Sequence, residues 1–232
     1  MANGVMDVLI RPDAFFSRIF EGEVSLKVPG LIVIAGAIFS ALAAYVAAGP
    51  TVKLLSGAAG SSASGALGII GMVGAVFAFI FFILIWWLIM GGVFFAISAA
   101  FKGKGLFKRT LQVTGYGLIP QVFSGVISLL LSLYYIPLVK VPVLTSLTDP
   151  SAITKATMQL LNDPAMREYL QVAGLVTVIF LIWSANIWIF GMKHARELSV
   201  RDAAITVGIP VAAWIIYTLV TAMGWLGVPG AA

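Results

Sequence analysis

Five long apolar runs, separated by short polar segments, dominate the pattern of this chain. The runs are of helical length and lack the period-two alternation that is typical of membrane barrel strands. About 20 apolar residues are enough to cross a bilayer as a helix. The pattern therefore predicts an all-α, polytopic membrane helical bundle with five transmembrane helices. The predicted spans are residues 31–48, 67–100, 111–139, 169–191 and 203–226.

Glycine and proline mark the ends and irregularities of these runs. Gly49-Pro50 is expected to end the first span, with a Gly/Ser/Ala-rich connector at 51–66. The second run passes Gly91-Gly92 without a polar residue, so we expect one long helix there, since a turn exposed to lipid would leave backbone groups unpaired. In the third run, Pro120 predicts a kink that frees the carbonyl of Tyr116. The nearest polar partners are Gln112, Thr114, Gln121 and Ser124.

Residues 140–168 make the one sizeable polar connection. Asp149-Pro150 and Asp163-Pro164 each place an acid that can cap a helix before a proline at the first helical position. These pairs predict a short helix at 150–162 and a second helix start at Asp163 that leads into the fourth span.

The first 30 residues are predicted to form a cytosolic interfacial segment, ahead of a single transmembrane domain at 31–232. Seven charged residues interrupt the first 27 positions, so no signal-peptide core is expected and the first span should be retained. If Pro12 begins a helix, Phe15, Phe16 and Ile19 share one side of it. Such a helix suits the membrane interface, or else packs on the loops of its own bundle. The sequence favours neither alternative.

Composition and charge agree with a membrane protein. With 61% hydrophobic and 10% charged residues, and a mean hydropathy of +1.07, the chain has too little polar surface for a soluble globule. The net charge of +5 follows the predicted topology, so nucleic-acid binding is not expected.

The distribution of Lys and Arg predicts an orientation. Ten of the 14 would lie on the cytosolic side if the N-terminus is cytosolic and the C-terminus outside. The positive-inside rule therefore predicts this orientation, in the cytoplasmic membrane. The cytosolic side then carries a basic face, which can contact an anionic partner or, more simply, anionic lipid headgroups. Its residues are Lys102, Lys104, Lys108, Arg109, Lys193 and Arg196.

Candidate chemistry is sparse. No span core contains Asp, Glu, Lys, Arg or His, which argues against a proton pump or an ion-coupled transporter. His194 is the single histidine and there is no cysteine, so multi-histidine and thiolate metal sites are excluded. His194 itself is interpreted as a solvated or headgroup-facing residue. We predict no catalytic residue, no metal site, no cofactor and no enzymatic activity.

Four residues of the spans have two interpretations each. Asn186 and Gln121 are candidates for polar contacts in a cavity, although an Asn in a membrane helix more commonly bonds a neighbouring helix. Tyr116 and Pro120 form either a kinked binding site or a structural bend, and the bend is the simpler interpretation.

Two motifs resemble the YIP domain family. The first is P-x-x-F-F-x-x-I in the N-terminal segment, at Pro12, Phe15, Phe16 and Ile19. The second is G-Y-G-x-x-P at the start of the third span, at Gly115, Tyr116, Gly117 and Pro120. The best-known members of this family interact with Ypt/Rab GTPases, whereas this chain looks more like the compact prokaryotic members. The resemblance implies a non-enzymatic membrane protein that associates with itself, a relative or another membrane protein.

Two functional hypotheses follow. The first is a membrane adaptor or organiser that acts through protein or lipid association, with a docking surface formed by residues 1–27, 101–110 and 193–202. The second is a passive channel or carrier for a small solute or lipid, because the kinks predicted at Pro120 and at Pro210 of the fifth span, together with Asn186, would border an uncharged cavity. Solute flux into liposomes would distinguish the second from the first.

Overall fold

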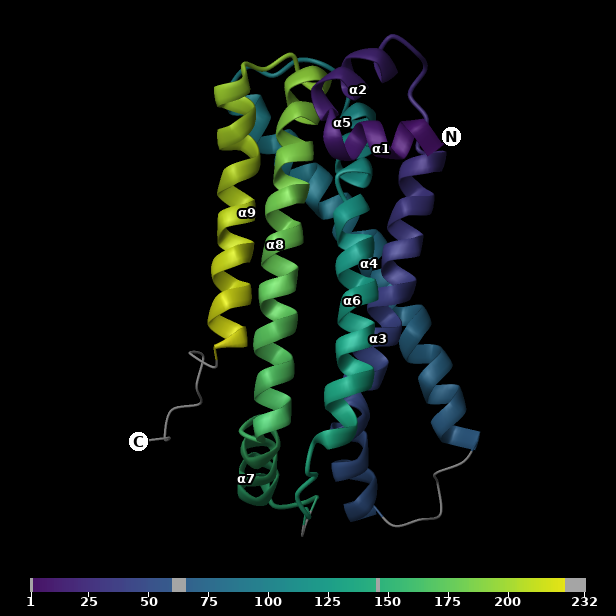
Figure 1. Ribbon diagram of the computed structural model, residues 1–232, viewed down its shortest axis with the longest axis vertical. Helices are drawn as coiled ribbons and strands as arrows, with labels where there is room; N and C mark the ends of the chain where they lie inside the picture. The colour runs from purple at the N-terminus through teal and green to yellow at the C-terminus, as the bar shows by residue number, and fades with distance from the viewer. Residues whose placement is uncertain (1, 60–65, 145–146, 224–232) are drawn as a thin grey trace.

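The structure is a computed structural model that describes residues 2–59, 66–144 and 147–223, and it is helical without strands over these ranges (Figure 1). Five helical stretches within them are long and apolar enough to cross a membrane. They are Lys27–Ser56, Val76–Ala100, Phe107–Leu138, Pro164–Ala195 and Val200–Ala222. The predicted all-α architecture with five spans is therefore confirmed.

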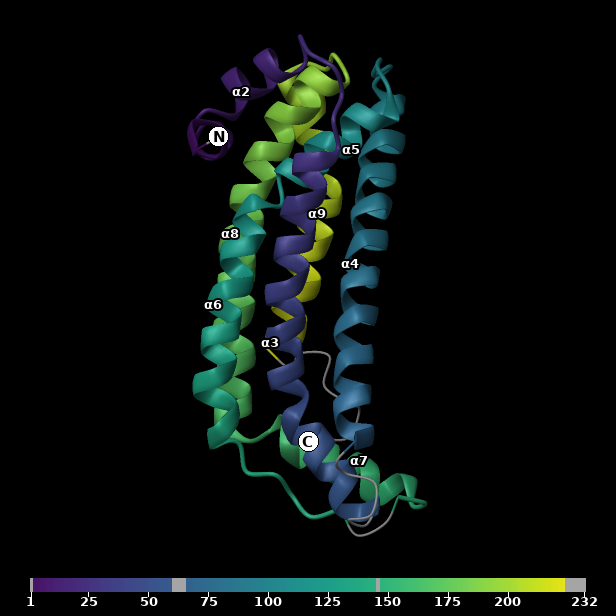
Figure 2. The same cartoon turned by 90° about the vertical axis from the view of Figure 1, so that its right-hand side faces the viewer.

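The helices follow one another in the order of the spans. They are α1 (Ala2–Ile10), α2 (Pro12–Ile19), α3 (Lys27–Ala59), α4 (Ala66–Ala100), α5 (Phe107–Tyr116), α6 (Ile119–Tyr135), the short 3₁₀ turn η2 (Ile136–Leu138), α7 (Pro150–Leu161), α8 (Pro164–Ala195) and α9 (Val200–Ala222). The long helices α3, α4, α6, α8 and α9 run along the long axis of the bundle (Figure 2).

The two ends of the bundle differ in structure and charge. Helices α1 and α2 lie across one end, beside the loops after α4 and α8, and α7 lies at the other end (Figure 1). The main buried cluster, which includes Phe94, Leu181, Trp188 and Val207, lies toward the α1–α2 end. Ten basic residues belong to that end, and Lys53, Lys140, Lys155 and Arg167 to the α7 end. We call the first the basic end.

The predicted helix starts in the polar connection are confirmed. Asp149 accepts a hydrogen bond from Ser151 N at 2.9 Å as α7 begins at Pro150. Asp163 accepts from Ala165 N at 3.0 Å at the start of α8. Each carboxylate satisfies a backbone N–H that has no partner within its helix, so the acid and the following proline fix the start of the helix.

The first span does not end at Gly49-Pro50, as the sequence predicts, because α3 continues through Pro50 to Ala59. The missing N–H of one proline is tolerated where neighbouring elements hold the helix. Leu54 does so here, since it is buried in a cluster with Leu144 and Ala156 of the α7 end. Residues 60–65 of the predicted connector lie outside the described residues, as do positions 224–226 of the predicted fifth span. The single long helix through Gly91-Gly92 is confirmed.

The third span is broken, where the sequence predicts a continuous helix with a kink. Helix α5 ends at Tyr116 and α6 begins at Ile119, so Pro120 lies in the first turn of a new helix. A tight turn joins the two: Gly117 N bonds Val113 O at 2.9 Å, and Leu118 N bonds Gly115 O at 3.2 Å. Proline is well tolerated in a first turn, where no N–H is needed.

Candidate functional site

The N-terminal helix α2 packs on the bundle, and Phe16 is its most deeply buried side chain. Phe16 is fully buried, and its ring lies against Gly191 of α8. A Cβ at position 191 would overlap Val113 and would lie 3.1 Å from the Phe16 ring, so the glycine allows the close approach. The structure therefore supports the second of the two interpretations of this segment, in which the helix packs on its own bundle.

The two sequence motifs meet at this contact. The ring centroids of Phe15 and Tyr116 are 5.1 Å apart, and those of Phe16 and Tyr116 are 6.2 Å apart, both in edge-to-face geometry. Such pairs each contribute about 0.5–1.5 kcal/mol beyond the burial of their area. The pattern at positions 12–19 and the pattern at 115–120 are thus two halves of one packing arrangement.

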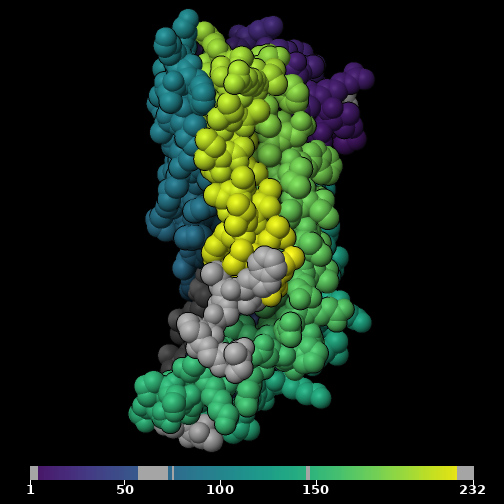
Figure 3. Space-filling model, turned by 90° about the vertical axis from the view of Figure 1, so that its left-hand side faces the viewer, coloured from purple at the N-terminus to yellow at the C-terminus, as the bar shows by residue number. Residues whose placement is uncertain are grey.

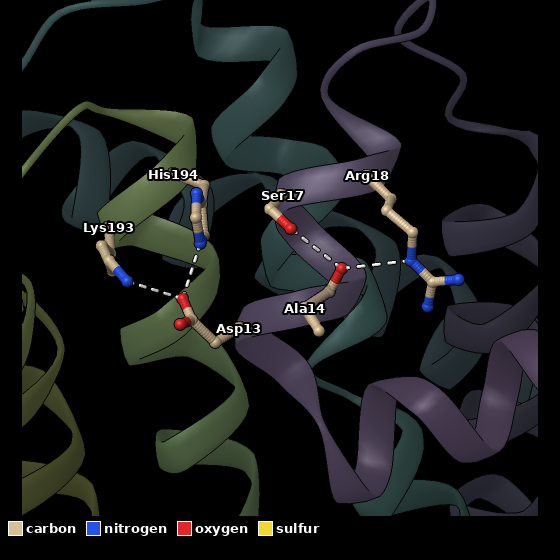
Figure 4. A network of polar contacts seen from close by, with 6 residues as sticks. All are labelled: Asp13, Ala14, Ser17, Arg18, Lys193 and His194. Carbon is tan, nitrogen blue, oxygen red and sulfur yellow. Dashed lines mark hydrogen bonds and ion pairs between the residues drawn. The ribbon is translucent and has the colours of Figure 1, made fainter.

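A polar contact holds the same helix from its other side. Asp13 of α2 lies between two side chains of α8, with its Oδ1 2.7 Å from Lys193 Nζ and 2.6 Å from His194 Nε2 (Figure 4). The hydrogen bond from Lys193, then that from His194, lowers the pKa of the Asp13 carboxyl. Asp13 is about half exposed, so solvent weakens the ion pair. His194 is therefore bound to α2 and 23% exposed, so it is only partly the solvated or headgroup-facing residue that the sequence indicates.

The glycines of the second motif allow four helices to converge. A Cβ at Gly115 would lie 2.6 Å from Pro29 Cβ at the start of α3 and 3.2 Å from the Trp87 ring of α4. A Cβ at Gly117 would overlap the Trp188 indole of α8. The G-Y-G sequence is thus explained by close packing, with Tyr116 directed to α2 between the two glycines.

Two tryptophans satisfy polar groups of α5. Thr114 O loses its usual helical donor, because Leu118 N bonds Gly115 O instead. Trp188 Nε1 donates to Thr114 O at 3.0 Å, and Trp87 Nε1 donates to Leu111 O at 3.0 Å. Within the part of the chain that the structure describes, none of the four predicted polar partners donates to the carbonyl of Tyr116. The signal missed in the sequence is that a buried indole N–H requires an acceptor.

The basic face is only partly exposed. Lys102, Lys104 and Lys108 are exposed, whereas Arg109 is half-buried and donates from Nη2 to Phe20 O at 3.2 Å. Lys193 is bound to Asp13.

Arg196 is buried, which contradicts its assignment to the basic face. It donates from Nε to Ser98 Oγ at 2.9 Å, from Nη2 to Gly103 O at 2.7 Å and from Nη1 to Gly105 O. Its guanidinium also lies over the Phe95 ring, 4.1 Å from the centroid. Burial lowers the pKa of Arg196, but the surrounding carbonyl oxygens and the ring stabilise its charge. Arg196 therefore holds the loop that carries Lys102 and Lys104.

A cavity of about 1040 Å³ lies within the bundle and is lined by residues of α3, α4, α6, α8 and α9. Gln121 lines it and donates to Ser184 Oγ at 3.4 Å. Asn186 does not line it: its side chain is exposed on α8 and forms no hydrogen bond with a described residue. The two candidate polar contacts are thus separated. Among the described residues there is no cluster of His, Cys, Asp or Glu that would hold a metal ion.

Comparison with known proteins gives one family. The sequence model of the Yip1 domain family matches residues 6–222 of this chain, which include both sequence motifs and all five spans. One similar protein is an uncharacterised protein of Methanocaldococcus jannaschii, 33% identical over 130 residues that cover 56% of this chain and 89% of that protein. No solved structure matches this chain.

Proposed function

Because this chain belongs to the Yip1 domain family, we propose that it is a non-enzymatic adaptor or organiser of the cytoplasmic membrane, with the basic end as its docking surface. The partner is another membrane protein or a second copy of this chain. Membrane lipids contact the rest of the basic end.

The observation that carries the proposal is the rigid support of exposed lysines at this end. The guanidinium of Arg196 holds the backbone of the 101–106 loop at two carbonyl oxygens, while Lys102 and Lys104 extend into solvent. Lysines that bind only lipid headgroups need no fixed backbone, because headgroup attraction depends on charge and distance. A fixed loop beside a docked α2 offers a surface of defined shape, as protein recognition requires.

The proposed orientation has the N-terminus in the cytosol and the C-terminus outside. The sorting of ten basic residues to one end of the bundle and four to the other supports it. A reporter fused after Ala232 should be active only outside the cytosol. A cytosolic signal from that reporter would show that the orientation is the opposite one. The docking surface would then lie outside the cytosol.

Photo-crosslinking tests the adaptor function. A photo-reactive residue replaces Lys104, and in a matched control it replaces Lys155, a basic residue of α7 at the other end. We expect a discrete protein adduct of one mass from position 104 only, and its loss when Phe16→Ala releases α2. Adducts to lipid alone, or equal adducts from both positions, would refute the adaptor function.

The cavity supports a second candidate function, a passive carrier for a small solute or lipid. Toward the basic end, however, the buried side chains of Phe94 and Trp188 close the bundle. This arrangement argues against a channel that runs through the bundle. It favours a site that opens to the side, between helices. Flux of uncharged solutes into liposomes, dependent on the protein, would favour the carrier.

A further inference from the structure

The bundle cavity has the dimensions of a lipid site. Its volume of about 1040 Å³ is at the upper end of the roughly 300–1,000 Å³ that is typical of small-molecule sites. Along α3 it extends from Ile32 to Ala44. At 1.5 Å per residue this is about 18 Å, more than half of the ~30 Å hydrocarbon core of a bilayer. An extended hydrocarbon chain therefore fits along the bundle axis.

The lining residues on α4 and α9 include exposed side chains, which mark the side on which the cavity would meet lipid. These helices meet through Trp86 and Trp214, whose ring centroids are 5.6 Å apart in edge-to-face geometry. Further from the basic end, the lining residues Phe82 and Tyr217 are 56% and 64% exposed. Figure 3 shows α4 and α9 side by side on this face of the molecule. A membrane lipid can thus enter sideways without crossing water.

A row of polar groups faces the cavity from α6. Gln121, Ser124 and Ser128 are spaced three and four residues apart, so they share one helix face, and all three line the cavity. Ser40 of α3 also lines it. Ser124 is 4% exposed, yet its hydroxyl has no hydrogen-bond partner among the described residues, and neither do those of Ser128 and Ser40. Unpaired hydroxyls at this depth favour a ligand that supplies a hydrogen-bonding group.

The lining excludes a charged ligand group. Among the described residues that line the cavity there is no Asp, Glu, Lys, Arg or His. A phosphate or ammonium group inside the cavity would therefore lose its hydration without gaining an opposite charge. The polar group that meets Gln121 and Ser124 must be uncharged.

We propose that the cavity is a binding site for an uncharged, hydroxyl-bearing membrane lipid of the diacylglycerol class. Its chains lie against the apolar lining, and its hydroxyl bonds the row formed by Gln121, Ser124 and Ser128. The lipid enters between α4 and α9. This inference is independent of the adaptor function, because it concerns the interior of the bundle and not the basic end.

Photo-labelling of the full chain in phosphatidylcholine vesicles tests the site. The probe is a diacylglycerol with a diazirine in one acyl chain, and labelled positions are mapped by mass spectrometry. Ala44→Phe fills the cavity, whereas Ala48→Phe, one turn further along α3, lies outside the lining and is the matched control. We expect Ala44→Phe to reduce labelling of cavity positions about tenfold and Ala48→Phe to leave it unchanged. Equal labelling of the two variants, or label confined to outer faces, would overturn the proposal.

A second experiment tests the polar row. Ser124→Ala with Ser128→Ala removes two hydroxyls with little change in volume. Ser132→Ala, on the same helix but outside the lining, is the control. Losing one or two hydrogen bonds of ~1 kcal/mol each should weaken binding of the diacylglycerol probe about five- to thirtyfold. Acetylation of the probe's hydroxyl should weaken its labelling of the wild type but not of the double variant. If acetylation has no effect on the wild type, or if an anionic phosphatidic acid probe labels the cavity as well, the proposed lipid class is wrong.

Loss of folding must be separated from loss of the site. Each variant is therefore compared with the wild type by circular dichroism and thermal unfolding in detergent. A variant that retains helicity and melting temperature but loses labelling supports the site. Crosslinking from Lys104 should be unaffected in these variants, so failure of the lipid site and failure of the adaptor function give different results.

Discussion

Replacing Phe16 by Ala should release the N-terminal helices from the bundle while leaving the five spans folded. Phe16 is fully buried and contacts Tyr116, Phe20 and the backbone of Gly191. Truncating a buried Phe to Ala typically costs about 3–5 kcal/mol. We take the lower end, about 3 kcal/mol, because α2 lies at the edge of the bundle. This corresponds to a rise of roughly 150-fold in the population with α2 detached.

A single cysteine measures this opening, since the chain has none of its own. Val8 of α1 is fully buried in the same cluster as Phe16, so a maleimide reaches Val8→Cys only when α1 and α2 detach. The labelling rate then follows the open population. Met6→Cys, which is 55% exposed, should react fast in every background and serves as the reference for reagent access.

Two further variants make the reasoning refutable. Gly191→Ala introduces a Cβ that overlaps Val113 and lies 3.1 Å from the Phe16 ring, and it should also accelerate labelling of Val8→Cys. In the double variant the Phe16 ring is gone and only the overlap with Val113 remains, so the combined effect should be smaller than the sum of the two single effects. Phe77→Ala, 68% exposed on α4, should have no effect. An unchanged rate in Phe16→Ala, or strict additivity with Gly191→Ala, would refute the packing argument.

Four other changes have defined outcomes. Trp188→Phe leaves the buried Thr114 carbonyl unpaired and should lower the unfolding free energy by about 1–3 kcal/mol, measured by thermal unfolding in detergent. Pro120→Ala should leave the break between α5 and α6 in place, because Pro120 is in a first turn, and spin-label distances across the break should not change. Arg196→Gln should accelerate tryptic cleavage of the 101–106 loop. Because the pKa of Asp13 is lowered, its contribution to α2 docking is fully present above the usual carboxyl pKa. It should be lost as pH falls through the lowered value, with faster cysteine labelling.

The spans and helix starts were predictable because they depend on local properties. An apolar run of sufficient length must be helical in lipid, and an acid before a proline identifies a helix start. Pro50 shows the limit of this logic. Its effect on α3 is decided by the burial of Leu54 against Leu144, and that contact joins segments about 90 positions apart in the sequence.

The candidate site was predictable only in its parts. Both motifs were visible in the sequence, but their contact through Phe16 and Tyr116 depends on how α2 folds back over α8. Arg196 has the charge of its exposed neighbours, and only the loop carbonyls around it explain its burial. Asn186 and Gln121 are both polar residues in apolar runs, yet helix rotation directs one outward and the other into the cavity. Packing against neighbouring helices decides which face of a helix is turned to the cavity, and this packing cannot be read from the sequence.

The position of Arg196 also imposes an order on assembly. Its guanidinium joins the α4–α5 connection to the α8–α9 connection, two hairpin turns that are synthesised more than 90 residues apart. Before residue 196 has been synthesised, the carbonyls of Gly103 and Gly105 lack this donor. The contacts of Arg196 at the basic end form only after the α8–α9 connection has been synthesised. A chain interrupted before position 196 can still pack its first three spans through contacts such as that of Trp87 with Leu111. It lacks only the side chain that joins the α4–α5 connection to the α8–α9 connection.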